Sequence, residues 1–324
     1  MAAAVSLIRP PRRWEALLRK AFKGENFQYD FEYLPEPGPG SLKQASAVIA
    51  ASLTEEQLKE AENLRLLQVP FAGTDRIDLK LMKKRGIIVS NSHENASSVA
   101  EHGMLLLLSL TKNLVNQDKD LRRGLWHGWV ARKPNAEARG KTLGIIGLGS
   151  IGREMARRAK SFDMRVIGTK ADPQKDADKL AGIVDAIHSS AELDSVIKKA
   201  HYLFVSVPLS KTTEGLIGES QLQRMKGKYL INVSRGEIVD EGALYAALAK
   251  NVLKGAAIDT WYLYPEEGKF AFPSRYPFHE LPNVVMTPHA AGFTKESAMR
   301  NWLFSFRNIA GFFRDGRAEN VVNR

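Results

Sequence analysis

A short glycine turn at 147–152, with the sequence GLGSIG, constrains the fold of this 324-residue chain more than any other stretch. An apolar run, TLGIIG at 142–147, leads into the turn, and an amphipathic segment at 151–162 follows it. In such a strand–turn–helix unit the first glycine permits the tight turn, and the second lets the backbone approach a pyrophosphate. The third glycine allows close packing of the helix against the strand. The pattern therefore predicts a dinucleotide-binding site.

The predicted contacts to the phosphates come from the turn and from the start of the helix, where backbone N–H groups are available. These cofactor-binding residues are Gly147, Gly149, Ser150, Ile151 and Gly152.

Lys170 stands at the tip of the next predicted strand, 165–169. An acid at this place accepts hydrogen bonds from the ribose hydroxyls and repels a 2′-phosphate, whereas a lysine reverses the sign. The sequence therefore favours NADP as the cofactor. In the alternative interpretation Lys170 is only an exposed residue on a neutral loop that tolerates either cofactor, and Asp172 could also accept the ribose.

Strand-like apolar runs alternate with amphipathic segments along the chain, a pattern typical of parallel sheets. Helices are expected at 14–22 and after Thr54. The strand candidates are 4–8, 47–50, 64–69, 86–91, 142–147, 165–169, 183–187, 202–207, 228–234, 255–260 and 284–289.

Two segments suggest how the chain divides into domains. The stretch 97–115 is apolar on nearly every helical face, so it must be buried between layers or domains. The amphipathic stretch 294–313 is expected to return to the first domain. We predict an α/β protein with one domain of residues 1–96 plus 293–324 and a second of 97–292.

Composition narrows the kinds of function. The chain has no cysteine, which excludes disulfides and thiolate sites and suits a reducing compartment. Its longest apolar block, 104–110, is much shorter than the ~20 residues of a membrane span. Its histidines form no HxH or HExxH pair, so no metal site is expected. We predict a cytoplasmic protein without a membrane partner.

The net charge of +11 raises the question of nucleic acid. The basic runs are short and are not interleaved with stacking aromatic residues, so no nucleic-acid partner is expected. A positive field also attracts small anions, including acidic substrates.

Five motifs together resemble the D-isomer-specific 2-hydroxyacid dehydrogenases, the family that includes glyoxylate/hydroxypyruvate reductases and phosphoglycerate dehydrogenases. The motifs are AGTDRID at 72–78, SSVAEHG at 97–103, PLSKTTEGLI at 208–217, NVSRGEIVDEGAL at 232–244 and NVVMTPHAAGFT at 283–294. The resemblance implies a flavodoxin-like substrate-binding first domain, a Rossmann second domain and an active site in the cleft between them. It also implies a homodimer, with 114–129 as the region to test.

Two residues in these motifs match the chemistry of 2-oxo acid reduction. Arg235 offers a bidentate fork that suits a carboxylate. His289, after Pro288 at a strand end, can act as general acid and base. The resemblance further implies that Ala72, Gly73 and Asn95 bind the substrate, that Asp259 meets the nicotinamide carboxamide and that Pro208 and Thr213 flank the cofactor. Asn95 could instead cap the helix that follows it.

One position departs from the family. Where most members have a glutamate that pairs with the catalytic histidine, this chain has Tyr264, which is neutral at pH 7. Either Tyr264 orients His289, or Glu266 or Glu267 replaces the missing acid. We predict reduction of a 2-oxo acid to a D-2-hydroxy acid. The alternatives are a formate-type hydride donor, which needs no proton acceptor, and a non-catalytic protein that senses the cofactor.

Overall fold

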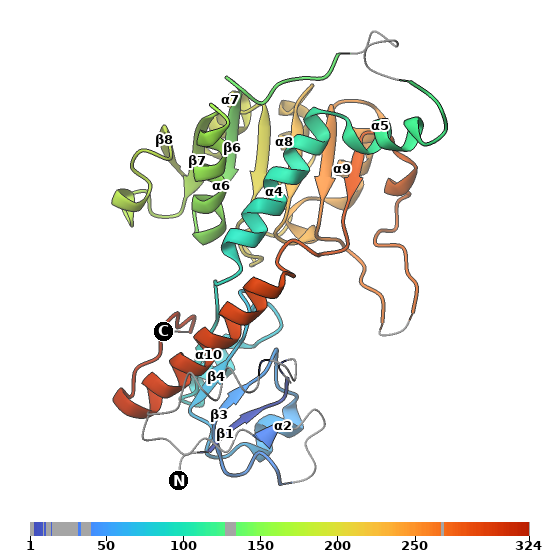
Figure 1. The fold of residues 1–324 in the computed structure, drawn as a ribbon. Helices are drawn as coiled ribbons and strands as arrows, with labels where there is room; N and C mark the ends of the chain where they lie inside the picture. Colours follow the sequence, from blue (N-terminus) through green and yellow to red (C-terminus); the bar gives the residue numbers. More distant parts are fainter. Residues whose placement is uncertain are drawn as a thin grey trace. The chain divides into compact units, whose positions relative to one another are not determined.

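The computed structural model describes residues 3–8, 10, 14, 32–33, 40–126, 134–266 and 269–323. The expected helix at 14–22, except for Trp14, and the acid Glu267 lie outside these residues. The chain forms two compact units: unit 1 contains Met1–Asn95 and Phe293–Arg324, and unit 2 contains Ala96–Gly292. Each unit is built on one parallel sheet, so the predicted α/β class is confirmed (Figure 1).

Unit 1 has a five-stranded parallel sheet in the described residues, with strand order β2-β1-β3-β4-β5. This is the order 2-1-3-4-5 of flavodoxin-like folds. The strands are β1 (Ala3–Ser6), β2 (Glu32–Tyr33), β3 (Ala45–Ile49), β4 (Leu66–Gln68) and β5 (Ile88–Ser90). The helices are α2 (Glu55–Glu60), α3 (Leu79–Lys84) and α10 (Lys295–Asp315).

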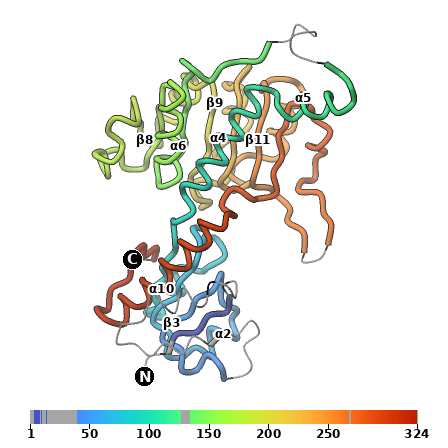
Figure 2. The backbone as a smooth tube through the Cα atoms, in the orientation of Figure 1, coloured from blue at the N-terminus to red at the C-terminus, as the bar shows by residue number. Residues whose placement is uncertain are grey.

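Segments from both ends of the chain lie side by side in unit 1 (Figure 2). Trp302, Phe306 and Ile309 of α10 pack on Ile49 and Leu66 of the sheet. The Thr294 side chain caps the start of α10, and Gly316, with φ +68°, ends it. The last described residues then cover the edge of β5, where Val322 N donates to Val89 O at 2.9 Å. Burial of this apolar face explains why the C-terminal helix belongs to unit 1.

Unit 2 has a seven-stranded parallel sheet in the described residues, with strand order β12-β11-β10-β9-β6-β7-β8. Read from β8, this is the Rossmann order 3-2-1-4-5-6 with one more strand at the end. The strands are β6 (Thr142–Ile146), β7 (Arg165–Lys170), β8 (Ala186–Ser189), β9 (Tyr202–Val205), β10 (Tyr229–Asn232), β11 (Gly255–Ile258) and β12 (Val284–Met286).

Helices cover both faces of this sheet, and each face has its own buried cluster. The first cluster includes side chains of α4 (Ala96–Thr111) and α6 (Ser150–Ser161). The second includes side chains of α7 (Leu193–Lys199), α8 (Glu219–Arg224) and α9 (Glu241–Ala249). The order reverses between β6 and β9, and such a switch point is where doubly wound sheets bind ligands.

The remaining elements of unit 2 are short. One α-helix, α5, spans Leu114–Leu121. Single turns of 3₁₀-helix occur at Ala177–Lys179, Ser190–Glu192, Gly236–Ile238 and Phe278–Glu280.

Two of the differences between predicted and observed elements have a clear local cause. The apolar stretch 97–115 is not one helix, because Asn113 adopts a left-handed backbone (φ +50°) that separates α4 from α5. The strand expected at 183–187 begins only at Ala186, because Ile183 and Val184 belong to a turn in which both N–H groups donate to Leu180 O. These residues are apolar because they pack on the core, not because they form a strand. No described helix is long and apolar enough to cross a membrane.

Candidate active site

The glycine turn follows β6 and leads directly into α6. Gly147 has φ +97°, a conformation that favours glycine. A Cβ on Gly152 would lie 2.2 Å from Gly147 O, so a side chain there would separate α6 from the turn. A Cβ on Gly149, in contrast, would meet nothing within 4 Å. Gly149 is also the N-cap of α6 and offers no side chain to the N–H groups of the first turn, where Ser150 and Ile151 lie. The turn therefore fits a pyrophosphate.

The loop after β9 is tied to the glycine turn. Ser206 Oγ donates to Gly147 O at 2.9 Å. Further along this loop, Thr213 Oγ1 donates to Pro208 O at 2.7 Å, so these two predicted cofactor residues are brought together. Both loops leave strands at the switch point of the sheet, which is the place that such a cofactor requires.

Lys170 is the last residue of β7 and is mostly buried. Its Nζ lies 3.4 Å from Asp176 Oδ2, and Asp176 also pairs with Lys179 at 2.8 Å. The hydrogen bond from Lys179, and then that from Lys170, hold the pKa of Asp176 below its ordinary value. Asp172 Oδ1 accepts the N–H of Gln174 at 3.0 Å and so closes a turn. The strand tip thus holds two lysines around one carboxylate.

His289 follows β12 and is bound through one ring nitrogen by Tyr264. The distance from Tyr264 Oη to His289 Nδ1 is 2.8 Å, and Trp261 N donates to the same hydroxyl at 3.2 Å. Burial raises the pKa of Tyr264, and the Trp261 hydrogen bond and the positive charge of Arg235 lower it less. Tyr264 therefore remains a neutral phenol near pH 7.

Arg235 follows β10 and is half-buried. Its Nη1 donates to Ser234 O at 2.7 Å, and Asn232 Nδ2 donates to Arg235 O at 2.8 Å. Its charge acts on Tyr264, so unit 2 brings together the cation, the phenol and the imidazole.

Asp259 directly follows β11 and is completely buried. Its Oδ1 accepts hydrogen bonds from Thr287 Oγ1 at 2.6 Å and Ala290 N at 2.9 Å, and its Oδ2 accepts one from Ala291 N at 3.0 Å. The expected contact with a nicotinamide carboxamide stays a prediction. In this structure the carboxylate is engaged by the segment that carries His289.

The predicted substrate residues belong to unit 1. Ala72 and Gly73 lie after β4, and the Asn91 side chain donates to Ala72 O at 2.7 Å. Asn95 does not cap a helix, because its buried Oδ1 has no hydrogen-bond partner among the described residues. The buried Oδ1 of Asn91 likewise has no hydrogen-bond partner among the described residues. Because buried polar atoms are normally hydrogen-bonded, these two amide oxygens are suited to receive a polar ligand.

Sequence reasoning assigned no role to Thr287 and His102, which contact this machinery together with Trp261. Thr287 bonds Asp259, His102 Nε2 lies 3.1 Å from Thr287 Oγ1, and Trp261 Nε1 donates to Thr287 O at 2.9 Å. Thr287 and His102 occur in the TPH and AEHG motifs, so their positions were visible in the sequence. Their contacts depend on packing between elements far apart in the chain.

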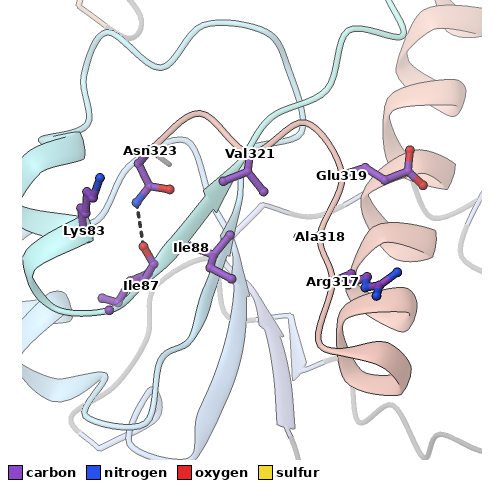
Figure 3. A pocket seen from close by; sticks show the side chains of 9 residues that line it. Lys83, Ile87, Ile88, Arg317, Ala318, Glu319, Val321 and Asn323 are labelled. Carbon is purple, nitrogen blue, oxygen red and sulfur yellow. Dashed lines mark hydrogen bonds between the residues drawn. The ribbon is translucent and has the colours of Figure 1, made fainter.

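A cavity of about 620 Å³ lies elsewhere, in unit 1 (Figure 3). It is bordered by β5 and by the final segment of the chain, where Asn323 Nδ2 donates to Ile87 O at 2.7 Å. None of the predicted site residues lines this cavity. In the described ranges no group of three or more His, Asp or Glu side chains is arranged to hold a metal ion.

Comparison with known proteins shows the family. Residues 104–291 match the family model "D-isomer specific 2-hydroxyacid dehydrogenase, NAD binding domain". A glyoxylate reductase of Korarchaeum cryptofilum is 33% identical over 284 residues, which cover 86% of this chain and 82% of that protein. This chain therefore belongs to the D-isomer-specific 2-hydroxyacid dehydrogenase family, as the motifs predicted.

Two D-3-phosphoglycerate dehydrogenases, from Methanocaldococcus jannaschii and Archaeoglobus fulgidus, are 33% and 32% identical. The chain spans only about half of their length, 52% and 51%.

Solved structures with the same fold contain either form of the cofactor. The D-lactate dehydrogenase of Aquifex aeolicus, complexed with NAD and lactic acid, is 27% identical, with a TM-score of 0.77 and coverage of 96% of this chain and 95% of that one. An acyclic imino acid reductase in complex with NADPH and D-Arg is 25% identical, with a TM-score of 0.79 and coverage of 99% of both chains. A nicotinamide cofactor suits the fold in both cases.

Proposed function

We propose that this protein reduces a 2-oxo acid to a D-2-hydroxy acid, and catalyses the reverse reaction, with a nicotinamide cofactor. The observation that carries the proposal is the 2.8 Å hydrogen bond between Tyr264 Oη and His289 Nδ1. It fixes the orientation of an imidazole in the same unit as Arg235 and the glycine turn. Family membership supports the same reaction.

In the proposed mechanism each residue has one task. Arg235 binds the substrate carboxylate through its guanidinium fork. His289 delivers a proton through Nε2 to the carbonyl oxygen of the 2-oxo acid, and in the reverse direction it removes that proton from the hydroxyl. Ala72, Gly73 and Asn95 bind the substrate. A bound nicotinamide cofactor would supply the hydride for C2 of the acid.

Tyr264 acts on His289 by orientation and not by charge. Because the phenol is neutral, it does not provide the negative partner that a glutamate would provide. A hydrogen bond to Nδ1 still restricts rotation of the ring, and correct orientation is a large part of catalysis by a bound acid.

For the cofactor we propose a preference for NADP. Lys170 and Lys179 both stand within hydrogen-bonding distance of Asp176, so they form a basic cluster beside the strand tip. Two lysines around one carboxylate leave net positive charge, which favours a 2′-phosphate. NAD is the alternative, in which Asp176 or Asp172 accepts the ribose hydroxyls.

We also propose that the protein is a homodimer that pairs through α5 and the residues after it. A row of exposed apolar side chains occurs there, with exposed fractions of 49–70%: Leu114, Val115, Leu121, Leu125 and Trp126. Exposed apolar side chains that gather on one part of a surface are typical of protein–protein interaction sites. Light scattering after gel filtration should show a dimer that Leu121→Glu converts to a monomer. Phe162→Glu, at an exposed apolar residue outside this row, should leave it a dimer. A monomeric wild type would contradict the proposal.

Cytoplasmic localisation stays a prediction.

The experiment that tests the function is an initial-rate measurement of NADPH and NADH consumption with glyoxylate, hydroxypyruvate, pyruvate, 2-oxoisocaproate and phenylpyruvate. Turnover with at least one acid, faster with NADPH, is the expected result. If the protein binds the cofactor but shows no turnover with any of these acids, the proposal is overturned. Formate oxidation by the same protein would then favour a formate-type dehydrogenase, and its absence a cofactor-sensing protein.

A further inference from the structure

The carboxylate of Asp259 accepts hydrogen bonds from residues that precede and follow His289 in the chain. Before the histidine, the hydroxyl of Thr287 donates to Oδ1 at 2.6 Å. After it, Ala290 N donates to Oδ1 at 2.9 Å and Ala291 N donates to Oδ2 at 3.0 Å. Asp259 itself is fully buried at the end of β11. One buried carboxylate therefore accepts hydrogen bonds from three donors within residues 287–291.

His289 needs such support because its backbone is in the left-handed region, with φ +54°. For a residue with a side chain this conformation is unfavourable and persists only where the surroundings impose it. The two amide hydrogen bonds that follow His289 point the backbone of 290–291 at Asp259. These two hydrogen bonds occur together with the left-handed backbone of His289.

The direction of the hydrogen bonds can be assigned from the donors that are available. A threonine hydroxyl has one hydrogen, and the short contact places that hydrogen between Thr287 Oγ1 and Asp259 Oδ1. His102 Nε2, 3.1 Å from the same oxygen, must therefore be the donor in this second contact. It also lies 3.5 Å from Asp259 Oδ1. His102 comes from α4, so this helix is connected to the segment that carries His289.

We propose that Asp259, Thr287 and His102 form a positioning unit, which holds the backbone of His289 in the left-handed conformation from which the ring meets Tyr264. This inference rests on the proposed function, in which His289 transfers the proton. Thr287 and His102 do not touch the reacting atoms. Their loss should therefore lower kcat and leave cofactor affinity nearly unchanged.

Thr287→Val tests the unit because it removes the hydroxyl and keeps the shape of the side chain. Thr260→Val is a matched control, since Thr260 is a neighbouring threonine that is fully buried and whose Oγ1 has no hydrogen-bond partner among the described residues. Thr287→Ser restores the hydroxyl and serves as the rescue variant.

Two measurements are needed. The first is amide hydrogen exchange at Ala290 and Ala291, followed by NMR on the protein without cofactor. The second is kcat and KM for the best 2-oxo acid, together with the Kd of the cofactor. Thr287→Val should speed exchange at both amides and lower kcat, each by about tenfold, as expected for loss of one hydrogen bond to a charged group. KM and Kd should stay within about twofold. Thr287→Ser should restore both values, and Thr260→Val should change neither.

Unchanged exchange and unchanged kcat in Thr287→Val would overturn the inference. Equal losses in Thr287→Val and Thr260→Val would also overturn it, because they would reflect packing of buried threonines alone. If Thr287→Val does not fold, His102→Leu removes the outer donor, and faster exchange at Ala290 and Ala291 is again expected. If the wild type reduces no acid, the proposed function fails, but the exchange measurement still decides whether this unit holds residues 289–291.

Discussion

The glycine turn and the segment around His289 both follow strands of the same sheet, but they are held in different ways. The turn is determined by its own backbone, because Gly147 adopts φ +97° and Gly152 leaves no space for a Cβ. The segment around His289 is held from outside, by Asp259 after β11, by Trp261 and Tyr264, and by His102 on α4. A site of the first kind is visible as a local pattern, and one of the second kind depends on side chains distant in sequence.

The largest effect should follow removal of the imidazole that the second region holds. His289→Ala should lower kcat for 2-oxo acid reduction by about 10³-fold, within the range that a positioned acid or base contributes. Binding of the cofactor, measured by fluorescence titration, should be unchanged, because the glycine turn does not depend on His289. Undiminished turnover would contradict the mechanism.

Two glycines of the turn should respond differently to substitution by alanine. Gly152→Ala should destabilise the protein by on the order of 3 kcal/mol, because its methyl group would lie 2.2 Å from Gly147 O. Gly149→Ala should leave the free energy of unfolding nearly unchanged, because the methyl group meets no protein atom within 4 Å. It should still weaken cofactor binding by about tenfold, since it stands where the pyrophosphate approaches. Urea unfolding and a cofactor titration separate the two effects. If the two variants lost stability and cofactor affinity to the same extent, Gly152 would not have a packing role distinct from the binding role of Gly149.

Tyr264→Phe removes only the hydroxyl that meets His289 Nδ1. We expect kcat to fall by about tenfold, close to the value of one hydrogen bond, with unchanged cofactor affinity. Burial raises the pKa of Tyr264 above its ordinary value near 10, so the phenol loses its proton only at still higher pH. The pH profile of Tyr264→Phe between pH 6 and 9 should therefore keep the shape of the wild-type profile. If the wild-type pH profile had a limb between pH 6 and 9 that Tyr264→Phe abolished, Tyr264 would not act as a neutral phenol.

Tyr264→Glu probes the same position with a charge. A carboxylate beside the imidazole favours its protonated form. Reduction should therefore persist to higher pH than in the wild type, by about one unit. Identical profiles would mean that position 264 does not influence the proton on His289.

A change of similar size is expected at the strand tip. Lys170→Asp should shift the ratio of kcat/KM values from NADPH toward NADH by about tenfold, because it reverses the charge beside the ribose. Lys254→Asp, at a lysine packed on Tyr229, is a control for net charge. An equal shift in both variants would show that only the overall field of the protein matters.

Much of the fold could be predicted because its signals are local. Alternating βα segments define parallel sheets, and a strand followed by G-x-G-x-x-G defines the first strand of a Rossmann unit. The errors also have local causes. Ile183 and Val184 have strand-like composition but serve as turn residues packed on the core. The end of α4 depends on the left-handed backbone of Asn113, which apolar periodicity does not reveal.

The candidate site could be predicted less completely. Its glycines, Arg235 and His289 were identified from motifs, and Tyr264 from its departure from the family pattern. The position of Asp259 against Thr287, Ala290 and Ala291 was not predicted, because the chain separates them by about thirty residues and a parallel crossover brings them together.

The sequence by itself determined the two parallel-sheet units and the glycine turn, and it supplied the candidates for the reacting side chains, since backbone conformation and residue chemistry act over a few neighbouring positions. Only the tertiary structure decided that Tyr264 meets Nδ1 of His289 and that one buried carboxylate fixes the backbone on both sides of that histidine. Such contacts form between strand ends and helices distant in the chain, and their geometry depends on how the sheet and its covering helices pack.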